Sequence, residues 1–357
     1  MKIVFDPQIF TEQKYGGISR YIVNLNNYLN RIENINSKIF APIHTNYHLS
    51  GSKKNRGIFI PTKINFLKKK MFKINEILFN RYLDNNIPDI HHATYYNYFT
   101  KKKNIPTVIT VHDLTHEKIS KKNLYPKQKS LTCSDHIICV SKSTKNDLMQ
   151  IYNIDSEKIS VVYESGGISF NHHNLYEIKS NDQKPYILFV GSRHGYKNWK
   201  ILIDAYSASN YLKRNFNIIF FGGGKFNNEE KKIIKEKKIS SNIIIAQGSD
   251  QQLLKLYNNC EIFVYPSLYE GFGLTLLEAL SLKKRILCSD IDIFREICDD
   301  AVSYFDPLNF NDLKDKLENI LINNVELNVD LAQKVIKKFS WEKCASGTLD
   351  VYKKVIK

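Results

Sequence analysis

The stretch YPSLYEGFGLTLLEAL, residues 265–280, places two carboxylates, Glu270 and Glu278, eight positions apart in mostly apolar sequence. Gly271 follows the first acid, and an apolar helix is expected to begin near Leu274. A helix N-terminus offers unpaired N–H groups to a phosphate, and glycine lets a ligand approach the backbone. Carboxylates on both sides of such a turn can accept hydrogen bonds from sugar hydroxyls. The pattern indicates a nucleotide-sugar site; the alternative is a surface loop followed by an exposed helical glutamate.

A second loop of this kind is VGSRHGYKN, residues 190–198, in which Arg193 and Lys197 stand between an expected strand and an expected helix. Two cations and a helix start that converge on one point can stabilise the charge of a departing diphosphate. Arginine forms paired hydrogen bonds to phosphate, whereas lysine acts as a point charge. Basic residues are common at loop ends, so this prediction gains its weight from residues 265–280.

Three further features follow expected strands, and each has two interpretations. Gly16 and Gly17 lack a G-x-G-x-x-G fingerprint, and they either admit a phosphate or sugar or only make a tight turn. His112 either contacts a sugar hydroxyl or moves a proton, or it is structural. The three glycines at 222–224 either line a phosphate pocket or only turn the chain.

Asp290 and Asp292 form a D-x-D sequence, which can clamp a divalent metal on a nucleotide diphosphate. No third acid is clearly placed beside them. A helix cap that starts near Asp292 is the simpler interpretation, and we therefore expect no metal.

Short β-type runs alternate with helix-length amphipathic segments in two series. The first series comprises residues 2–6, 89–93, 107–113, 136–141 and 159–163; the second comprises 186–191, 217–222, 242–248, 261–267 and 285–290. This alternation predicts an α/β protein with two doubly wound parallel sheets. The polar segment 165–184 is the expected boundary, which gives domains 1–170 and 184–339 and a final amphipathic helix at 340–357.

The composition is that of a globular protein. Hydrophobic residues make up 43% of the 357 residues and charged residues 25%, and no apolar run is long enough to span a bilayer. The N-terminus resembles a strand rather than a signal peptide, so we expect a cytoplasmic protein. The six cysteines are scattered without a C-x-x-C pair, which favours buried thiols over a zinc site.

The net charge of +16 is concentrated in the first half of the chain. Residues 1–180 hold 26 basic and 14 acidic residues, or +12, and the remainder holds 26 and 22, or +4. This charge is either a solvated lysine-rich face or an attraction to an anionic membrane or a phosphate-bearing substrate; no motif supports nucleic acid. Residues 65–83 interleave apolar and lysine side chains, as in a helix on an acidic bilayer or a core helix with lysines in water.

These motifs together resemble the retaining glycosyltransferases of family 4, which have the GT-B fold of two Rossmann-like domains facing a central cleft. The stretch from Glu270 to Glu278 is similar to the E-x7-E motif of that family, and VGSRHGYKN is similar to its phosphate-binding segment. The resemblance extends over nearly the whole chain in the family's order. The segment SLKKRILCSD after the second glutamate departs from the small-residue turn usual in the family.

The resemblance implies site residues and their roles. The implied catalytic residues are Arg193, Lys197, Glu270 and His112. The implied donor-binding residues are Gly16, Gly17, Gln247, Gly248, Phe272, Gly273, Leu274, Thr275 and Glu278. Arg193 and Lys197 would hold the diphosphate, and Glu278 the ribose. Glu270 would bind the donor sugar, with His112 beside the transferred group. The family acts without a metal or other cofactor, and its C-terminal helix crosses back to the first domain.

The implied activity is transfer of a hexose from a nucleotide sugar to a saccharide or lipid-linked saccharide acceptor. Bacterial surface polysaccharide, O-antigen or capsule, is the expected product, made at the inner face of the plasma membrane. GDP-mannose is the first expected donor, with UDP- and dTDP-sugars as alternatives. A sugar-nucleotide epimerase or hydrolase of the same fold is a rival, and a non-catalytic sugar-binding protein is another. No carboxylate is an evident covalent nucleophile, so we expect front-face substitution with retention.

Overall fold

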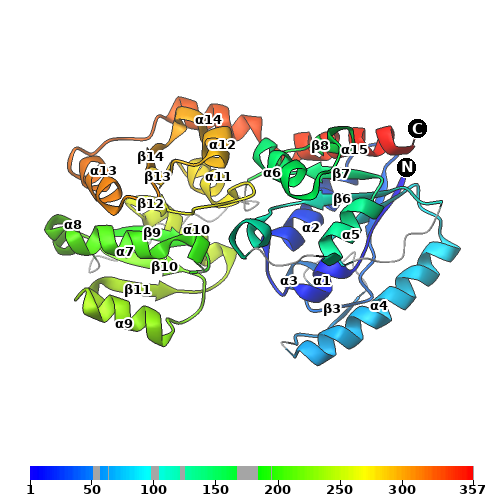
Figure 1. The fold of residues 1–357 in the computed structure, drawn as a ribbon, viewed down its shortest axis with the longest axis horizontal. Coiled ribbons are helices and arrows are strands. Elements are labelled where there is room, and N and C mark those ends of the chain that lie inside the picture. The colour runs from blue at the N-terminus through cyan, green and yellow to red at the C-terminus, as the bar shows by residue number, and fades with distance from the viewer. Residues whose placement is uncertain are drawn as a thin grey trace. The chain divides into compact units, whose positions relative to one another are not determined.

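The computed structural model describes residues 1–50, 57–62, 64–97, 104–120, 125–166, 184–193 and 195–356. The chain divides into two compact units, shown in Figure 1. Unit 1 comprises Met1–Glu164 and Ser340–Lys357, and unit 2 comprises Ser165–Phe339. Most of the polar segment in which the sequence predicts a boundary lies outside the described residues.

Unit 1 is built on a six-stranded parallel sheet with the strand order β2-β1-β5-β6-β7-β8. Its strands are β1 (Lys2–Phe5), β2 (Asn36–Ile39), β5 (Ile90–Ala93), β6 (Thr107–Val111), β7 (His136–Cys139) and β8 (Ile159–Val161). A separate parallel pair is formed by β3 (Ile43–His44) and β4 (Ile58–Phe59). Every residue of β5, β6 and β7 is buried, as expected for central strands that helices cover on both faces.

The helices of unit 1 include one from the far end of the chain. They are α1 (Gln8–Glu12), α2 (Gly17–Leu29), α3 (Tyr47–Ser50), α4 (Asn65–Asn85), α5 (Tyr125–Cys133), α6 (Lys142–Tyr152) and α15 (Trp341–Ile356). The last of these packs on α2, and apolar residues of both helices belong to one buried cluster. Tyr352 of α15 also hydrogen-bonds His92 of β5, so the C-terminal helix is anchored to the sheet of unit 1.

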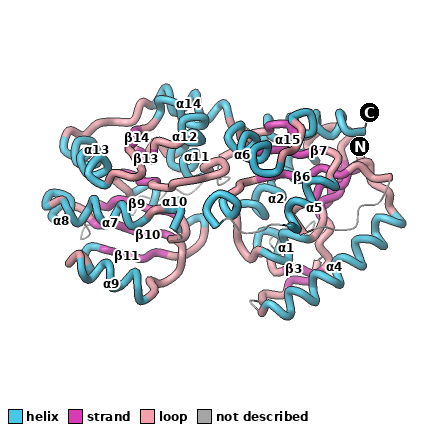
Figure 2. The backbone as a smooth tube through the Cα atoms, viewed as in Figure 1, coloured by secondary structure: helices cyan, strands magenta, loops and turns pink. Residues whose placement is uncertain are grey.

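Unit 2 repeats the architecture with a different strand order, β11-β10-β9-β12-β13-β14, again all parallel. Its strands are β9 (Tyr186–Val190), β10 (Asn217–Phe221), β11 (Ile243–Ala246), β12 (Ile262–Tyr265), β13 (Ile286–Ser289) and β14 (Ser303–Phe305). Its helices are α7 (Trp199–Ala208), α8 (Asn210–Asn215), α9 (Asn228–Glu236), α10 (Asp250–Asn259), α11 (Leu274–Ser281), α12 (Asp292–Cys298), α13 (Phe310–Ile322) and α14 (Val329–Lys338). Figure 2 shows the alternation of strands and helices along both units.

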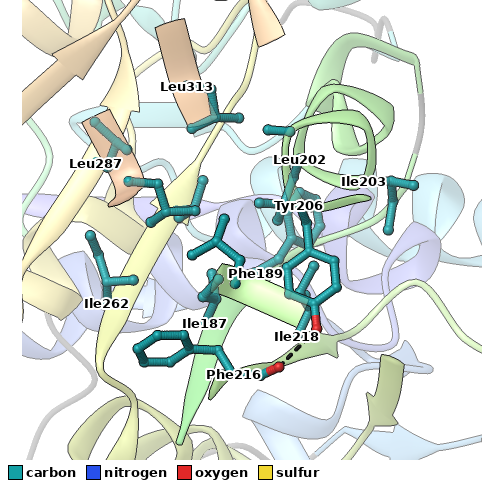
Figure 3. Packing of buried hydrophobic residues seen from close by; sticks show 14 of the residues in the cluster. Ile187, Phe189, Leu202, Ile203, Tyr206, Phe216, Ile218, Ile262, Leu287 and Leu313 are labelled. Carbon is teal, nitrogen blue, oxygen red and sulfur yellow. Dashed lines mark hydrogen bonds between the residues drawn. The ribbon is translucent and has the colours of Figure 1, made fainter. Parts of the chain in front are cut away.

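The core of unit 2 lies between its sheet and the helices α7 and α13. Figure 3 shows aliphatic side chains of β9, β10, β12 and β13 meeting Leu202 and Ile203 of α7 and Leu313 of α13. Tyr206 is fully buried among them, and its hydroxyl donates a 2.8 Å hydrogen bond to the carbonyl of Phe216. The polar end of this large ring therefore carries no unsatisfied donor into the core.

All ten β-type runs named from the sequence contain strands, but the sequence did not reveal four others. β2 alternates exposed and buried residues in the polar sequence NSKI, and β14 is an edge strand of three residues. β3 and β4 have two residues each. A search for apolar runs passes over β2 and β14, which are polar or short edge strands, and over the two-residue strands β3 and β4, although it finds the more apolar edge strands β8 and β11.

Candidate active site

The strand order of unit 2 reverses between β9 and β12, which are neighbours in its sheet. The chain leaves these strands on their way to opposite edges, and ligands of open parallel sheets bind in the crevice at this switch point. Lys197 ends a short 3-10 turn in the loop that follows β9, and Glu270 lies in the loop that follows β12. The topology of unit 2 therefore brings together two of the residues predicted from separate motifs.

Lys197 and Glu270 form an ion pair with 2.6 Å between Nζ and Oε1. Each side chain is 13% exposed, and Lys197 also donates a 3.2 Å hydrogen bond to the hydroxyl of Tyr265. Burial alone lowers the pKa of Lys197, but Glu270 and the nearby tyrosines outweigh it, so the net pKa is raised. Lys197 therefore stays positively charged at the carboxyl edge of the sheet, where it is paired with Glu270.

The backbone after Glu270 turns sharply into α11. Gly273 caps the helix with φ of +100°, a left-handed conformation that side chains disfavour, and a Cβ there would lie 3.3 Å from the ring of Phe294. Phe272 is buried edge-on against Phe339 at 5.6 Å between ring centroids. Leu274 and Thr275 form the first turn of α11, where N–H groups lack partners within the helix.

Glu278 lies in α11 one turn after Thr275 and is 1% exposed. Its carboxylate accepts a 3.5 Å hydrogen bond from the hydroxyl of Tyr257 in α10. The side chain is therefore part of the packing between α10 and α11, and any ligand contact must reach a buried carboxylate.

Arg193 shares the loop of Lys197 but has different surroundings. Its side chain is 2% exposed, and Nε donates a 2.9 Å hydrogen bond to Glu230 of α9. Nη1 and Nη2 donate to backbone carbonyls of the loop after β10: Gly222, Gly223, Gly224 and Lys225, at 3.0 to 3.2 Å. The guanidinium also lies over the ring of Phe226 at 4.5 Å. Arg193 thus ties three segments of unit 2 together.

The loop held by Arg193 is the triple glycine at 222–224. All three glycines have positive φ, at +93°, +69° and +74°. A Cβ on Gly223 would lie 2.8 Å from Nη1 of Arg193. Glu230, the partner of Arg193, also forms the capping box of α9 with Asn227, so one carboxylate holds both the arginine and the start of the helix. The sequence predicts a phosphate pocket or a turn at these glycines, and the structure shows a turn that is wrapped around a buried arginine.

Gln247 and Gly248 follow β11, an outermost strand of the same sheet, and are exposed. The next residue, Ser249, begins the capping box of α10 with Gln252. In strand order β11 is separated from β9 by β10, so these residues lie to one side of the switch point.

In unit 1, His112 follows β6 and is buried. Its Nδ1 hydrogen-bonds Glu164, and its ring packs edge-on against Tyr21 at 4.8 Å between centroids. Tyr21 stands one turn into α2, the helix that Gly16 caps in extended conformation and that Gly17 begins. The structure therefore brings His112 to the helix that the glycines introduce.

The switch point of unit 1 lies between β1 and β5 and holds a closed polar network. Asp6 is fully buried after β1. Its carboxylate accepts hydrogen bonds from Thr94 at 2.6 Å and from the Gln8 side chain at 2.7 Å. Nε2 of His91 lies 3.1 Å from the same carboxylate. A buried carboxylate with this many partners is satisfied within the unit.

The D-x-D sequence has two different surroundings. Asp290 forms a paired contact with Arg295, 2.7 and 2.8 Å long, and this partner lowers the pKa of Asp290. Asp292 is the first residue of α12, whose cap is Ile291 and not an aspartate side chain. Within the described ranges no three His, Cys, Asp or Glu residues gather as metal ligands.

Two acids of these networks escaped the sequence analysis. Glu164 comes three residues after β8, a strand end of the type searched, but it stands alone in VVYESGG. Glu230 carries a recognisable signal, since Asn227 three residues earlier gives the spacing of a capping box. That signal announces a helix start and does not indicate the arginine that Glu230 pairs with.

Comparison with known proteins shows which protein family has this architecture. The profile described as Glycosyltransferase Family 4 matches residues 15–164, and that described as Glycosyl transferases group 1 matches residues 174–338. An uncharacterized glycosyltransferase of Methanocaldococcus jannaschii is 32% identical over 269 residues, which are 71% of this chain and 70% of that protein. The O-antigen chain mannosyltransferase RfbU of Salmonella typhimurium is 28% identical over 193 residues, 52% of this chain and 50% of its own length.

A solved structure extends the likeness over the whole fold. Anabaena HepE in complex with UDP-glucose has a TM-score of 0.75 at 16% identity, covering 98% of this chain and 100% of that one. Two Rossmann-like units of this kind define the GT-B class of glycosyltransferases. The chain belongs to glycosyltransferase family 4, as its motifs predict.

Two further expectations concern the chain as a whole. All six cysteines are free thiols and five are buried, as predicted. In the part of the chain that the structure describes, the helices fall short of the length and apolar character that crossing a membrane requires.

Proposed function

We propose that the chain is a retaining hexosyltransferase that moves a sugar from a nucleotide sugar to a saccharide or lipid-linked saccharide acceptor. In this proposal unit 2 binds the donor and unit 1 the acceptor. The observation that carries it is the Lys197–Glu270 pair at the switch point of unit 2, beside the first turn of α11. A diphosphate needs a fixed cation and helix N–H groups, and a sugar needs a carboxylate for its hydroxyls.

In the proposed reaction, Lys197 and the N-terminus of α11 stabilise the diphosphate as it leaves the anomeric carbon. One oxygen of the departing diphosphate takes the acceptor proton, so that attack and departure occur on the same face. Glu270 orients the donor sugar, and Glu278 the ribose. His112 is proposed to contact the transferred group, and Arg193 supports the site by holding the loop at 222–224. The network around Arg193 favours an indirect role for it, although direct contact with the diphosphate stays a prediction to be tested.

The proposed product is a bacterial surface polysaccharide such as O-antigen or capsule, and the first proposed donor is GDP-mannose. The mannosyltransferases of Salmonella and Escherichia coli among the relatives support this donor. HepE is named in complex with UDP-glucose, so UDP-sugars are the main alternative. The proposed site needs no metal, because Lys197 supplies the positive charge.

Calorimetric titration with GDP, UDP and dTDP in the presence of EDTA tests the donor site. We expect one nucleotide to bind, Lys197→Gln to weaken it strongly, and the matched control Lys200→Gln to have no effect. Lys200 is a suitable control because it is exposed and pairs with Glu229. Binding only after addition of Mg²⁺ or Mn²⁺ would contradict a metal-free site. Donor consumption without any acceptor, at the rate seen with one, would favour a hydrolase.

We also propose that unit 1 contacts an anionic membrane through the outer face of α4, the residues Phe66, Leu67, Ile74, Ile77 and Arg81. The opposite face of the helix is buried in unit 1. On the outer face, the exposed fractions are 62% for Phe66, 44% for Ile74 and 55% for Ile77. Apolar side chains among cations, on a helix already packed by its other face, suit the interface of an acidic bilayer.

Flotation with vesicles of phosphatidylglycerol tests this contact. We expect the protein to float at low salt, and the double variant Ile74→Glu/Ile77→Glu to remain at the bottom of the gradient. Ile322→Glu is the matched control, since Ile322 is 56% exposed and lies in unit 2. Equal loss of flotation in the control would show that α4 is not the contact.

A further inference from the structure

Unit 1 contains a cavity of about 630 Å³ that none of the predicted site residues lines. Its walls are Glu12, Asn65, Lys68, Lys69, Phe72, Lys73, Asn97 and Pro126. Three lysines and one glutamate leave an excess of two positive charges around it.

The position of this cavity follows from the sheet of unit 1. Glu12 ends α1, which follows β1, and Asn97 comes after β5. Pro126 lies in α5, which is the first α-helix after β6. These three segments leave the carboxyl ends of three consecutive strands in the order β1-β5-β6, and α4 supplies the lysines. The carboxyl edge beside a switch point is where open parallel sheets bind ligands.

The lysines of the cavity are not equivalent. Lys68 donates a 2.7 Å hydrogen bond to the carbonyl of Glu12, so it fixes α4 to the end of α1. Lys69 and Lys73 are exposed and stand four residues apart, hence on neighbouring turns of one helix face. Neither forms an ion pair with any described residue. Like charges at this spacing repel one another, so an anion between them would relieve an unfavourable contact.

We propose that this cavity binds the phosphate groups of the acceptor, with Lys69 and Lys73 as its cations and Phe72 as its apolar wall. The inference rests on the proposed function and deepens it: the acceptor is a phosphate-linked saccharide and not a neutral glycan. Either a lipid diphosphate or a soluble sugar phosphate carries the required group. Lys69 and Lys73 bind the acceptor, and Lys197 in unit 2 binds the donor.

The test measures binding to the full chain without donor. The probes are inorganic pyrophosphate, farnesyl diphosphate, glucose 1-phosphate and farnesol, and the variants are Lys69→Gln/Lys73→Gln, Lys70→Gln and Lys197→Gln. Lys70 is the matched control, because it lies on the same helix, outside the cavity, with its ammonium over the ring of Phe66. The double variant should weaken farnesyl diphosphate at least tenfold, while Lys70→Gln should change it less than twofold.

The crossed design separates this site from the donor site. Lys197→Gln should weaken the nucleoside diphosphate and leave farnesyl diphosphate unchanged, and Lys69→Gln/Lys73→Gln should do the reverse. Tighter binding of farnesyl diphosphate than of glucose 1-phosphate supports a lipid-linked acceptor, and equal affinity for the two compounds supports a soluble acceptor. If farnesol binds as tightly as farnesyl diphosphate, the proposal is wrong. It is also wrong if Lys70→Gln weakens the binding of farnesyl diphosphate as much as the double variant does. Failure of nucleotides to bind would instead count against the proposed donor site.

Discussion

The two units place different chemistry at the same topological position. At the switch point of unit 2, Lys197 and Glu270 are partly accessible and paired with each other. At the switch point of unit 1, Asp6 is fully buried and its carboxylate accepts hydrogen bonds from Gln8 of α1 and from Thr94, which follows β5. Among the exposed cations of unit 1, Lys69 and Lys73 of α4 line a cavity. Topology therefore indicates where a ligand can bind, and the side chains decide whether one does.

The same contrast recurs within a single loop of unit 2. Arg193 and Lys197 are four residues apart, yet Arg193 is enclosed by Glu230 and four carbonyls, while Lys197 faces Glu270. A buried guanidinium with this many acceptors has little capacity left for a ligand. Arg193 is better suited to hold the site together, and Lys197 to stabilise the developing charge.

The largest expected effect is on the stability of unit 2. Arg193→Met leaves Glu230 and the carbonyls of the 222–224 loop without their donor, which typically costs about 3–5 kcal/mol for a buried pair. Glu230→Gln should also destabilise unit 2, and the double variant should lose less than the sum, because both changes remove one network. Urea denaturation followed at Trp199, in a Trp341→Phe background, measures unit 2 alone, since the chain has two tryptophans, one in each unit.

The exposed cation Lys200 is the control for Arg193, and Lys200→Met should change stability by about 0.5 kcal/mol or less. If Arg193→Met left the stability unchanged and abolished nucleotide binding, Arg193 would contact the diphosphate directly. The comparison between the two cations would then be wrong.

The second prediction concerns catalysis. Lys197→Ala removes the cation at the switch point and should lower kcat/KM for transfer by about 10²–10³, the usual cost of losing a preorganised charge-stabilising group. Stability should fall less than in Arg193→Met, because the Lys197 side chain is more exposed. Lys197→Arg should restore part of the rate. A rate unaffected by Lys197→Ala would remove the basis of the proposed donor site.

From the sequence, it could be predicted that Lys197 and Glu270 lie at one edge of the sheet. The different surroundings of Lys197 and Arg193 could not be predicted. Lys197 and Glu270 were predicted from two motifs because both follow apolar strands, and parallel strands bring such loops to one edge. Arg193 stands in the same motif, and no pattern there distinguishes a ligand-binding arginine from a buried one. The difference arises from Glu230, a residue 37 positions away, through contacts that only the folded chain creates.

In unit 1, the central strands and the apolar edge strand β8 were predictable from their apolar runs, while the polar edge strand β2 was not. His112 was predicted from its position after β6, but Glu164 was not associated with it. The cavity lined by Lys69 and Lys73 was also beyond sequence reasoning, since it needs α4 to lie beside residues of α1, of α5 and of the segment after β5. Local sequence patterns therefore predict helices, strands and their ends. Packing between residues far apart in the sequence decides which of these ends come together in one site.

The third prediction separates the units by acid sensitivity. Burial lowers the pKa of His92 in unit 1 to about 3, against 6.5 for the ordinary group. Above pH 6.5 this histidine is neutral in the folded and the unfolded chain, so it costs nothing. Below pH 6.5 the unfolded chain binds a proton that the folded chain cannot, and unit 1 loses about 1.4 kcal/mol per pH unit until pH 3. The described residues of unit 2 contain no histidine.

We therefore expect unit 1, monitored at Trp341 in a Trp199→Phe background, to lose about 2 kcal/mol between pH 6.5 and pH 5 through His92. Unit 2, monitored at Trp199, should lose much less. His92→Gln should reduce the pH dependence of unit 1 without abolishing it, because burial also lowers the pKa of His136 to about 4 and lowers that of His44. Equal acid sensitivity of both units, or an unchanged slope in His92→Gln, would show that His92 is not the titrating group.

The smallest expected effect tests whether Glu164 positions His112. A carboxylate that accepts from Nδ1–H fixes the ring and leaves Nε2 as the atom facing away from it. Glu164→Gln keeps the size of the side chain but loses its charge, and it should lower kcat/KM about tenfold, the equivalent of one charge-assisted hydrogen bond. Glu157→Gln, an exposed glutamate in the turn before β8, is the matched control and should behave like the wild type.

A structural role for Glu164 predicts a different result. Loss of packing alone would lower stability and leave the protonation pattern of His112 as it is, whereas a positioning role changes which ring nitrogen carries the proton. Nitrogen-15 NMR of the imidazole measures that pattern directly, without donor or acceptor. We expect Nδ1–H in the wild type and a mixture of tautomers in Glu164→Gln. An unaltered tautomer together with an unaltered rate would show that Glu164 does not position His112.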